Sequence, residues 1–273
     1  TTRQVTYPSR DGTEVRMFVV SSADQPPGPK PTILYGYGGF NVALTPWHGP
    51  SILAWVGAGG VYAVANLRGG KEEGEQWHRA GMLANKQNVF DDLHAAADRL
   101  VTDGVTTPDR LAIYGGSNGG LLVGAALTQH PDRYAAVVCS APLLDMLRYE
   151  RFGLGSTWSG EYGSAADPEQ FGWLRAYSPY HNVHSGVPYP AVLFTVFESD
   201  TRVDPLHARK LAAALQHATS SPHPILVRRE TEVGHGARAV SRLVDLYADQ
   251  LAFLAHELSL PVPLSPGGPM DTR

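Results

Sequence analysis

The segment Gly115-Gly116-Ser117-Asn118-Gly119 constrains the fold of this chain more than any other. It follows an apolar run at residues 110–114 and precedes a helix-like run at residues 121–127. The pattern G-x-S-x-G between a strand and a helix is typical of a turn that holds a nucleophilic serine, because the glycines permit a sharp bend. With 29 glycines in the chain, the flanking elements carry the argument rather than the bare pattern. We predict that Ser117 is a nucleophile and not part of a simple glycine-rich turn.

Short apolar runs alternate with helical patterns along most of the chain. The expected strands lie at residues 32–35, 61–65, 110–114, 135–139, 191–197 and 225–229, and the expected helices at 48–57, 89–102, 118–130, 205–218 and 237–258. A strand pair at residues 5–7 and 14–20 precedes them. This alternation predicts an α/β fold with a mostly parallel central sheet and helices on both faces.

Residues 142–190 interrupt the alternation and are rich in aromatic side chains, namely Trp158, Tyr162, Phe171, Trp173, Tyr177 and Tyr180. We expect an insertion of short helices over the C-terminal edge of the sheet, with about half of these aromatic residues in the core. Residues 1–260 are expected to form one catalytic domain. A disordered tail rich in proline and glycine is expected at residues 261–273.

The composition is that of a globular protein, with 43% hydrophobic and 18% charged residues. A net charge of −4 gives no indication of a nucleic acid or an anionic membrane as partner. Apolar runs all fall short of the roughly 20 residues that span a bilayer, and no signal-peptide pattern is visible. Cys139 is the single cysteine and falls in an expected buried strand, so we expect a cytoplasmic location without disulfides.

A serine hydroxyl needs a base that removes its proton and an acid that orients this base. In α/β-hydrolases these residues follow the chain order nucleophile, acid, histidine. Asp200 follows the strand at 191–197, and His235 lies between two glycines after the strand at 225–229. Glu198 remains an alternative orienting acid, whereas Asp204 is better explained as a helix cap before a proline. The sequence therefore predicts an α/β-hydrolase fold with the triad Ser117, Asp200 and His235.

The other histidines are weaker candidates for the base. Five of them fall in helical stretches, namely His94, His130, His207, His217 and His256. His181 and His184 are three residues apart in a loop, but no acidic residue or cysteine accompanies them at the spacing of metal ligands. We expect neither a metal nor a cofactor.

The oxyanion formed by serine attack requires donors that are already in place. One expected donor is the backbone amide of Asn118, directly after the nucleophile. The second is expected from the loop Tyr35-Gly-Tyr-Gly-Gly-Phe40, whose glycines permit close approach and whose tyrosines offer phenolic donors. A simple glycine turn is the alternative interpretation of this loop.

Several motifs now point to a known family. They are Tyr35-Gly-Tyr-Gly-Gly-Phe-Asn41, Ala63-Val-Ala-Asn-Leu-Arg-Gly-Gly70, Leu83-Ala-Asn-Lys-Gln-Asn88, Phe90-Asp-Asp92, Gly115-Gly-Ser-Asn-Gly-Gly120, Tyr177-Ser-Pro179, Arg202-Val203 with Pro205-Leu-His207, and Gly234-His-Gly236. With these motifs the chain resembles the catalytic domain of the prolyl oligopeptidase (prolyl endopeptidase) family.

The resemblance implies a role for each matching position. Ser117, Asp200 and His235 match the family triad, and Tyr37 matches the tyrosine that shares the oxyanion hole with the Asn118 amide. Trp158 matches the tryptophan that stacks on the substrate proline. The rest of that apolar pocket is matched by Phe40, Leu143, Tyr162 and Val203. Arg202 matches the arginine that holds a carbonyl of the substrate backbone.

The resemblance implies a serine peptidase that cleaves short peptides after proline through an acyl-enzyme. An indole face and apolar walls suit the flat, apolar proline ring. The family usually carries a β-propeller domain, which is absent from this sequence, so we expect a fragment or a separately prepared catalytic domain. A stand-alone member of the family is the alternative. Arg68-Gly-Gly70 and the loop at residues 72–75 are expected at the face where a propeller would dock.

Three alternatives remain open. The same triad can serve an esterase, a deacylase or a peptide macrocyclase. A non-catalytic binding module on a hydrolase scaffold belongs to a different class, although every catalytic position holds a competent residue. A chain that acts only together with the missing domain is the third alternative.

Overall fold

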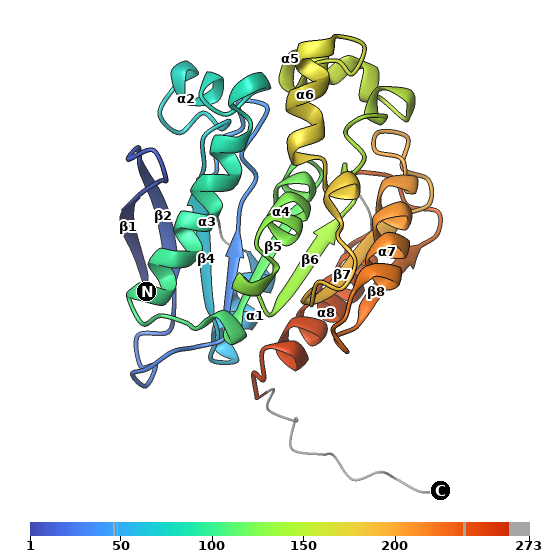
Figure 1. The fold of residues 1–273 in the computed structure, drawn as a ribbon. Coiled ribbons are helices and arrows are strands. Elements are labelled where there is room, and N and C mark those ends of the chain that lie inside the picture. Colours follow the sequence, from blue (N-terminus) through green and yellow to red (C-terminus); the bar gives the residue numbers. More distant parts are fainter. Residues whose placement is uncertain (46, 48, 237–238, 262–273) are drawn as a thin grey trace, which may run out of the picture.

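A twisted sheet runs through the computed structural model, which describes residues 1–45, 47, 49–236 and 239–261 (Figure 1). Within these residues the sheet has eight strands in the order β1-β2-β4-β3-β5-β6-β7-β8. Strand β2 runs antiparallel to β1 and β4, and the other neighbours pair in parallel. The strands are β1 (Thr2–Pro8), β2 (Glu14–Val20), β3 (Thr32–Tyr35), β4 (Val61–Asn66), β5 (Leu111–Gly116), β6 (Ala136–Ser140), β7 (Ala191–Phe197) and β8 (Ile225–Glu230).

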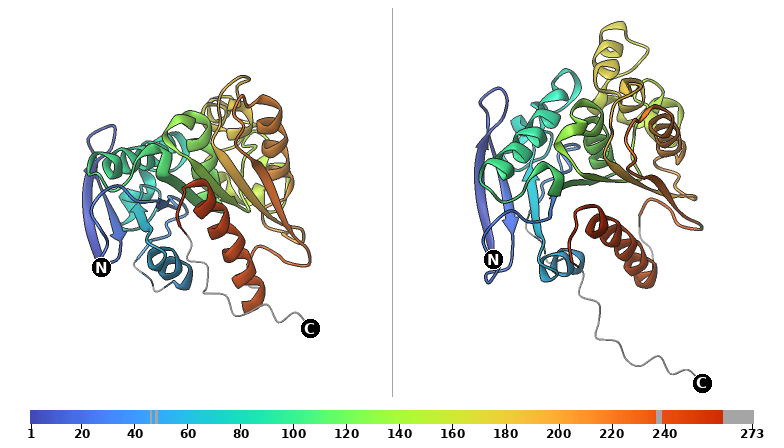
Figure 2. Two further views of the ribbon diagram at one scale, coloured as in Figure 1. Left: turned by 90° about the horizontal axis from the view of Figure 1, so that it is seen from below. Right: turned by 60° about the horizontal axis from the view of Figure 1, so that its bottom comes forward.

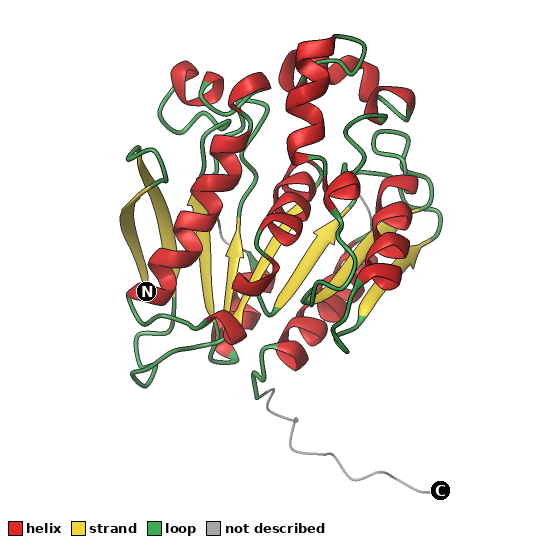
Figure 3. Cartoon of the chain, viewed as in Figure 1, coloured by secondary structure: helices red, strands yellow, loops and turns green. Residues whose placement is uncertain are grey.

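Helices connect the parallel strands (Figure 3). They are α1 (Pro50–Gly57), α2 (Glu75–Arg79), α3 (Gln87–Thr102), α4 (Asn118–Gln129), α5 (Ser159–Tyr162), α6 (Pro168–Tyr177), α7 (Leu206–Ala218) and α8 (Val240–Glu257). Single 3-10 turns lie at η1 (Leu83–Asn85), η2 (Pro108–Arg110), η3 (Pro131–Arg133), η4 (Tyr149–Arg151), η5 (Gly155–Trp158) and η6 (Pro179–Asn182). The expected α/β-hydrolase fold is confirmed, although the sequence did not indicate α2.

The ends of the expected helices shift by a few residues. The helix expected from residue 48 begins at Pro50, because proline lacks an amide hydrogen and is suited to the first helical turn. Asp167 caps α6 by accepting the amides of Glu169 and Gln170. The helix expected from residue 237 begins at Val240, and residues 237–238 lie outside the described residues.

Helices α1 and α8 cover one face of the sheet, while α3, α4 and α7 cover the other (Figure 2). Alternate residues of β4 divide between these layers. Tyr62 and Val64 pack in the cluster that contains Trp55 of α1, whereas Ala63 and Ala65 pack in the cluster of α3 and α4. Strands β4 and β7 are buried along their whole lengths, as expected for strands covered on both faces.

The segment at residues 142–190 forms short helices above the carboxyl ends of the strands, where α5 and α6 stand at the top of Figure 1. Tyr162 and Tyr177 are buried in the core, whereas Phe171 is 42% exposed. The expected tail lies outside the described residues from residue 262 onward. Across the described residues, no helix combines the length and apolar character needed to span a bilayer.

A buried ion pair connects the first hairpin to α3. The Arg68 guanidinium lies 2.6 Å from Asp92 and 2.5 Å from Asp11, and Ser9 donates a hydrogen bond to Asp92. The side chains of Arg68 and Asp92 are 4% and 0% exposed. Burial raises the pKa of Asp92, and the hydrogen bond from Arg68 acts against this. The charge of Arg68 is therefore used inside the domain. The expected position of residues 68–70 and 72–75 at a docking face stays a prediction.

Candidate active site

Ser117 occupies a sharp turn between β5 and α4. Its φ of 56° and ψ of −119° are strained for a residue with a side chain. The turn needs glycine on both sides, since a Cβ on Gly115 would lie 2.0 Å from the carbonyl oxygen of Gly119. The Ser117 amide donates to the carbonyl of Ser140 at 2.8 Å, which ties the turn to β6. This geometry presents the hydroxyl at the tip of the turn.

His235 connects the serine to a carboxylate. Its Nε2 lies 3.1 Å from Ser117 Oγ, and its Nδ1 lies 2.6 Å from Asp200 Oδ2. The Asp200 side chain is 1% exposed, and its other oxygen accepts the amides of Arg202 and Val203 at 2.9 Å each. A carboxylate at Nδ1 favours the tautomer with the proton there, which leaves the Nε2 lone pair directed at the serine. The structure thus brings all three predicted residues into one hydrogen-bonded chain.

The competing acids have other partners. Glu198 pairs with Arg209 at 2.6 Å and with Arg229 at 2.8 Å, and hydrogen bonds from these arginines lower its pKa. Asp204 accepts the amide of Leu206 at 2.8 Å at the start of α7, as a cap would.

The expected oxyanion donors lie beside the nucleophile. Asn118 is the first residue of α4, so its amide has no carbonyl partner within that helix. Burial raises the pKa of the Tyr37 phenol, as does the charge of Glu161, while the charge of Arg202 and a hydrogen bond with Ser117 oppose them. The Tyr37 hydroxyl is therefore protonated at neutral pH and close to Ser117. It can donate a hydrogen bond to an oxygen there.

Two partly exposed aromatic rings adjoin this site. Phe40 meets Trp158 at 6.4 Å between ring centroids and Tyr162 at 5.6 Å, both edge to face. Phe40 and Trp158 keep part of their surface open, whereas Tyr162, Leu143 and Val203 are at most 3% exposed. The first two can contact a ligand, and the buried three belong to the core cluster against which Phe40 and Trp158 pack. This arrangement suits a flat apolar group.

Arg202 lies at the rim of the site. It is exposed, and its charge is close enough to lower the pKa of Tyr37. A guanidinium in this position can donate to a carbonyl oxygen with charge assistance.

A cavity of about 400 Å³ adjoins two side chains of the triad. Ser117 and His235 line it together with residues of β5, β6, β7 and α8, namely Tyr114, Ser140, Phe197, Leu246 and Tyr247. The Phe40 and Trp158 rings come instead from the loop after β3 and from the insertion. The cavity that Ser117 lines and the two aromatic rings are therefore formed by different segments.

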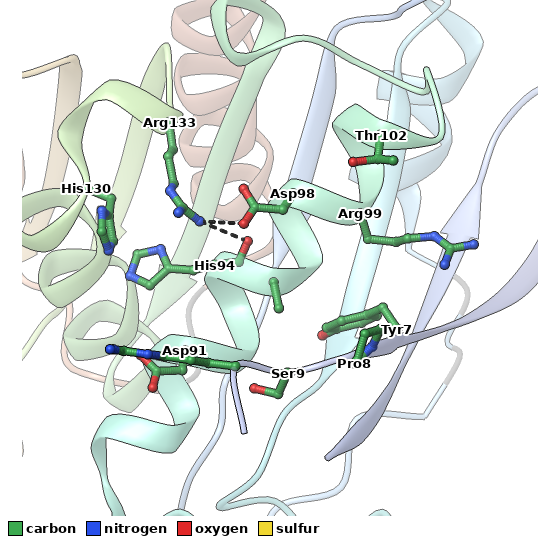
Figure 4. Close-up of a pocket in the computed structure, with 12 residues that line it drawn as sticks. Tyr7, Pro8, Ser9, Asp91, His94, Asp98, Arg99, Thr102, His130 and Arg133 are labelled. Atoms are coloured by element: carbon green, nitrogen blue, oxygen red, sulfur yellow. Dashed lines mark hydrogen bonds and ion pairs between the residues drawn. The ribbon is translucent and has the colours of Figure 1, made fainter. Parts of the chain in front are cut away.

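A larger cavity of about 560 Å³ lies between β1 and α3 (Figure 4). His94 there contacts the Tyr134 hydroxyl at 2.8 Å, and burial lowers the pKa of His94 to about 3. Arg133 donates to Asp98 and to the backbone carbonyl of His94. Because these polar groups bond to one another, we interpret them as structural.

The histidine pair at 181 and 184 has other contacts. His181 lies 2.9 Å from Ser178 Oγ and 3.2 Å from Arg148. In the part of the chain that the structure describes, no three histidine, cysteine, aspartate or glutamate side chains are arranged to hold a metal ion.

Sequence reasoning missed one group of side chains below the site. Lys86 and Glu161 form a buried ion pair at 3.1 Å, and His78 contacts the same glutamate at 2.8 Å. Lys86 lies in the motif at residues 83–88, but Glu161 is 75 residues away in sequence. No local pattern relates the two positions.

Comparisons with known proteins match most of this chain to one family. The model of the "Prolyl oligopeptidase family" matches residues 47–260. A prolyl endopeptidase of Elizabethkingia miricola is 43% identical over 260 residues, which are 94% of this chain and 37% of that relative. The "Dual function macrocyclase-peptidase POPB" of Galerina marginata is 39% identical over 263 residues, covering 94% of this chain and 36% of that relative.

Solved structures give the same result. A prolyl endopeptidase studied for the role of inter-domain dynamics in catalysis and specificity aligns with a TM-score of 0.94 and 56% identity, covering 96% of this chain and 39% of that chain. Prolyl oligopeptidase B of Galerina marginata, bound to a 35mer hydrolysis and macrocyclization substrate, aligns with a TM-score of 0.93 and 38% identity, covering 96% and 38%. The chain thus spans less than two fifths of the length of each of these proteins.

Proposed function

This chain belongs to the prolyl oligopeptidase family, and we propose that it is a serine peptidase that hydrolyses short peptides on the carboxyl side of proline. The observation that carries the proposal is the hydrogen-bonded chain from Ser117 through His235 to Asp200, together with the partly exposed rings of Phe40 and Trp158. The triad supplies acyl-transfer chemistry, and the two aromatic rings supply a site for a proline ring.

The reaction proceeds in two halves. His235 Nε2 accepts the Ser117 proton as the serine oxygen bonds to the carbonyl carbon of proline. The Asn118 amide and the Tyr37 phenol stabilise the oxyanion that forms. The carbon–nitrogen bond then breaks, and His235 gives its proton to the leaving amine. In the second half, water loses a proton to His235 and attacks the ester, and the proton returns to Ser117. Asp200 stabilises the imidazolium in both halves.

Specificity for proline follows from the aromatic rings of the pocket and from the lack, among its described residues, of polar partners for a donor or a charge. Proline has no amide hydrogen, so it leaves no donor unsatisfied in an apolar site. A charged side chain there would lose its hydration without gaining a partner. Arg202 is placed to hold a carbonyl of the preceding peptide segment, which orients the scissile bond.

A peptide macrocyclase is the second candidate, because the relative named as a dual function macrocyclase-peptidase is 39% identical to this chain. In that reaction the amino terminus of the same peptide replaces water as the group that attacks the acyl-enzyme. The triad and the proline pocket serve both reactions. An esterase or deacylase would use the same triad without dependence on proline.

The matched relatives are much longer than this chain, so we propose that a further domain restricts substrate size, as the sequence resemblance implies. The division into a catalytic domain with an insertion at residues 142–190 also stays a proposal, as does the cytoplasmic location.

The test compares a Gly-Pro anilide with a Gly-Ala anilide and a short-chain nitrophenyl ester. We expect kcat/KM for the proline anilide to exceed that for the alanine anilide by at least about 100-fold. A linear peptide with an internal proline, analysed by mass spectrometry, separates hydrolysis from cyclisation. Ester hydrolysis without any preference for proline would contradict the peptidase proposal.

A further inference from the structure

Two buried side chains, those of Asn118 and Lys86, hold the backbone of the loop at residues 35–40, which we call the oxyanion loop. The carbonyl of Tyr37 accepts a hydrogen bond from Asn118 Nδ2 at 2.6 Å. The next carbonyl, that of Gly38, accepts one from Lys86 Nζ at 3.0 Å. Two consecutive peptide groups beside the nucleophile therefore have fixed orientations, and the Tyr37 Cα, which carries the phenol side chain, directly precedes the first of them.

Each of these donors is held in turn by the insertion. Tyr162 donates to Asn118 Oδ1 at 2.8 Å, and Glu161 accepts from Lys86 Nζ at 3.1 Å. Glu161 and Tyr162 are neighbours on α5, directly after η5, which ends at Trp158. The lysine also lies 5.3 Å from the centre of the Tyr162 ring. The oxyanion loop and the segment that carries Trp158 are thus connected by two parallel sets of contacts.

Lys86 is in an unusual environment for a lysine. Its side chain is 1% exposed, and that of Glu161 is 5% exposed. Burial lowers the pKa of Lys86, while the Glu161 carboxylate acts in the opposite direction. Replacing a buried ion pair by apolar side chains is often neutral or stabilising, so fold stability alone is a weak explanation for this pair.

We propose that Lys86 is a positioning residue for the oxyanion hole, which fixes Tyr37 through the Gly38 carbonyl and joins it through Glu161 to the pocket segment. The inference rests on the proposed acyl transfer at Ser117. Lys86 touches neither substrate nor the reacting atoms in this scheme, and its effect passes through Tyr37. Removal of Lys86 and removal of the Tyr37 hydroxyl should therefore disable the same interaction.

A double-mutant cycle tests this dependence. Lys86→Met keeps the length of the side chain and removes its donors, and Tyr37→Phe removes the phenolic hydroxyl. We expect Lys86→Met to lower kcat on the Gly-Pro anilide about 10-fold to 100-fold, by analogy with the loss of one oxyanion donor. In the Tyr37→Phe background we expect the same substitution to change kcat by less than about threefold. An equal loss in both backgrounds would overturn the proposal, because general loosening of the fold does not depend on Tyr37.

The control is a second lysine that pairs with a buried acidic side chain and lies near a tyrosine ring, although its side chain is 21% exposed. Lys210 pairs with the buried Asp145 and lies 4.2 Å from the centre of the Tyr180 ring, but it belongs to α7. Lys210→Met should change kcat by the same factor with and without the Tyr37 hydroxyl. If Lys86→Met does not fold, Glu161→Gln enters the same cycle, with a smaller effect of the same kind expected. Independence of Glu161→Gln and Tyr37→Phe would then overturn the proposal.

The same double-mutant cycle is measured with a fluorophosphonate. This reagent contains no proline and forms a covalent bond with Ser117. Its second-order rate constant should show the same coupling between Lys86 and Tyr37. A protein that reacts with the fluorophosphonate but cleaves no proline peptide would contradict the proposed function, and the coupling would still decide the role of Lys86.

Discussion

Asp200 Oδ2 lies 2.6 Å from His235 Nδ1, while Asp200 Oδ1 accepts the backbone amides of Arg202 and Val203. Both carboxylate oxygens therefore face donors. Since a carboxylate is acceptor-only and an amide is not, this position can be filled by an aspartate but not by an asparagine without conflict.

Asp200→Asn should disable catalysis while preserving the fold. The asparagine NH₂ must face either His235 or the two backbone amides, so one donor meets another and the ring loses its preferred tautomer. We expect kcat to fall about 10⁴-fold, as for the equivalent change in a well-studied serine protease. The measurement is kcat on the Gly-Pro anilide. Asp204→Asn is the control, because asparagine caps helices as well as aspartate does. Parent-level kcat in Asp200→Asn would contradict this assignment.

Trp158→Ala tests the proline pocket. The indole is partly exposed and packs edge to face on Phe40, so its loss removes surface for the substrate more than it removes core. We expect kcat/KM for the proline anilide to fall about 10-fold or more, and the unfolding midpoint to change little. Trp173→Ala, in α6 of the same insertion, should leave kcat/KM near the parent value. Equal losses in the two variants would show that the insertion as a whole, and not this ring, governs activity.

The two acidic partners of Arg68 should differ in their effect on stability. Asp92 is fully buried, so Asp92→Asn leaves the buried guanidinium without its main counter-charge. We expect a loss of about 3–5 kcal/mol in the free energy of unfolding. Asp11 is 47% exposed, so solvent screens its charge, and Asp11→Asn should cost clearly less than Asp92→Asn. Urea unfolding of the two variants gives both values, and a reversed order would refute this description of the ion pair.

The pH dependence of stability gives a further test at Asp11. A hydrogen bond with Arg68 lowers the pKa of Asp11 from 3.8 to about 2. A carboxyl whose pKa is lower in the folded protein stabilises the fold above its unfolded pKa, and this contribution is lost as the pH falls through the folded pKa. The parent should therefore exceed Asp11→Asn in stability at pH 5, with the difference closing between about pH 4 and pH 2. A difference that stays constant over this interval would exclude the mechanism.

Much of the fold could be predicted because its signals are local. The bounds of β3 and β7 agree with the expected strands, and the bend at Ser117 follows from adjacent glycines. The order of Ser117, Asp200 and His235 could be predicted because each follows the end of a recognisable strand. The structure brings them together as the fold class requires.

Contacts between distant segments could not be predicted in this way. No local pattern indicated that the Arg68 side chain is buried, because its partner Asp92 lies 24 residues later, on α3. Lys86 lies 75 residues from Glu161 in the sequence. The residues that flank a lysine do not indicate whether its side chain is buried. Charged residues are rarely buried, so the default expectation for each of them is solvent exposure.

The role of Ser117 as the nucleophile is tested by identifying the atom that bonds to the substrate. The protein is mixed with a Gly-Pro nitrophenyl ester, quenched in acid within the first turnover, digested and analysed by mass spectrometry. We expect a Gly-Pro acyl group on the peptide that contains Ser117. In Ser117→Ala we expect no acyl group and a loss of several orders of magnitude in turnover. Undiminished turnover in Ser117→Ala, or an acyl group on another residue, would contradict this role of Ser117.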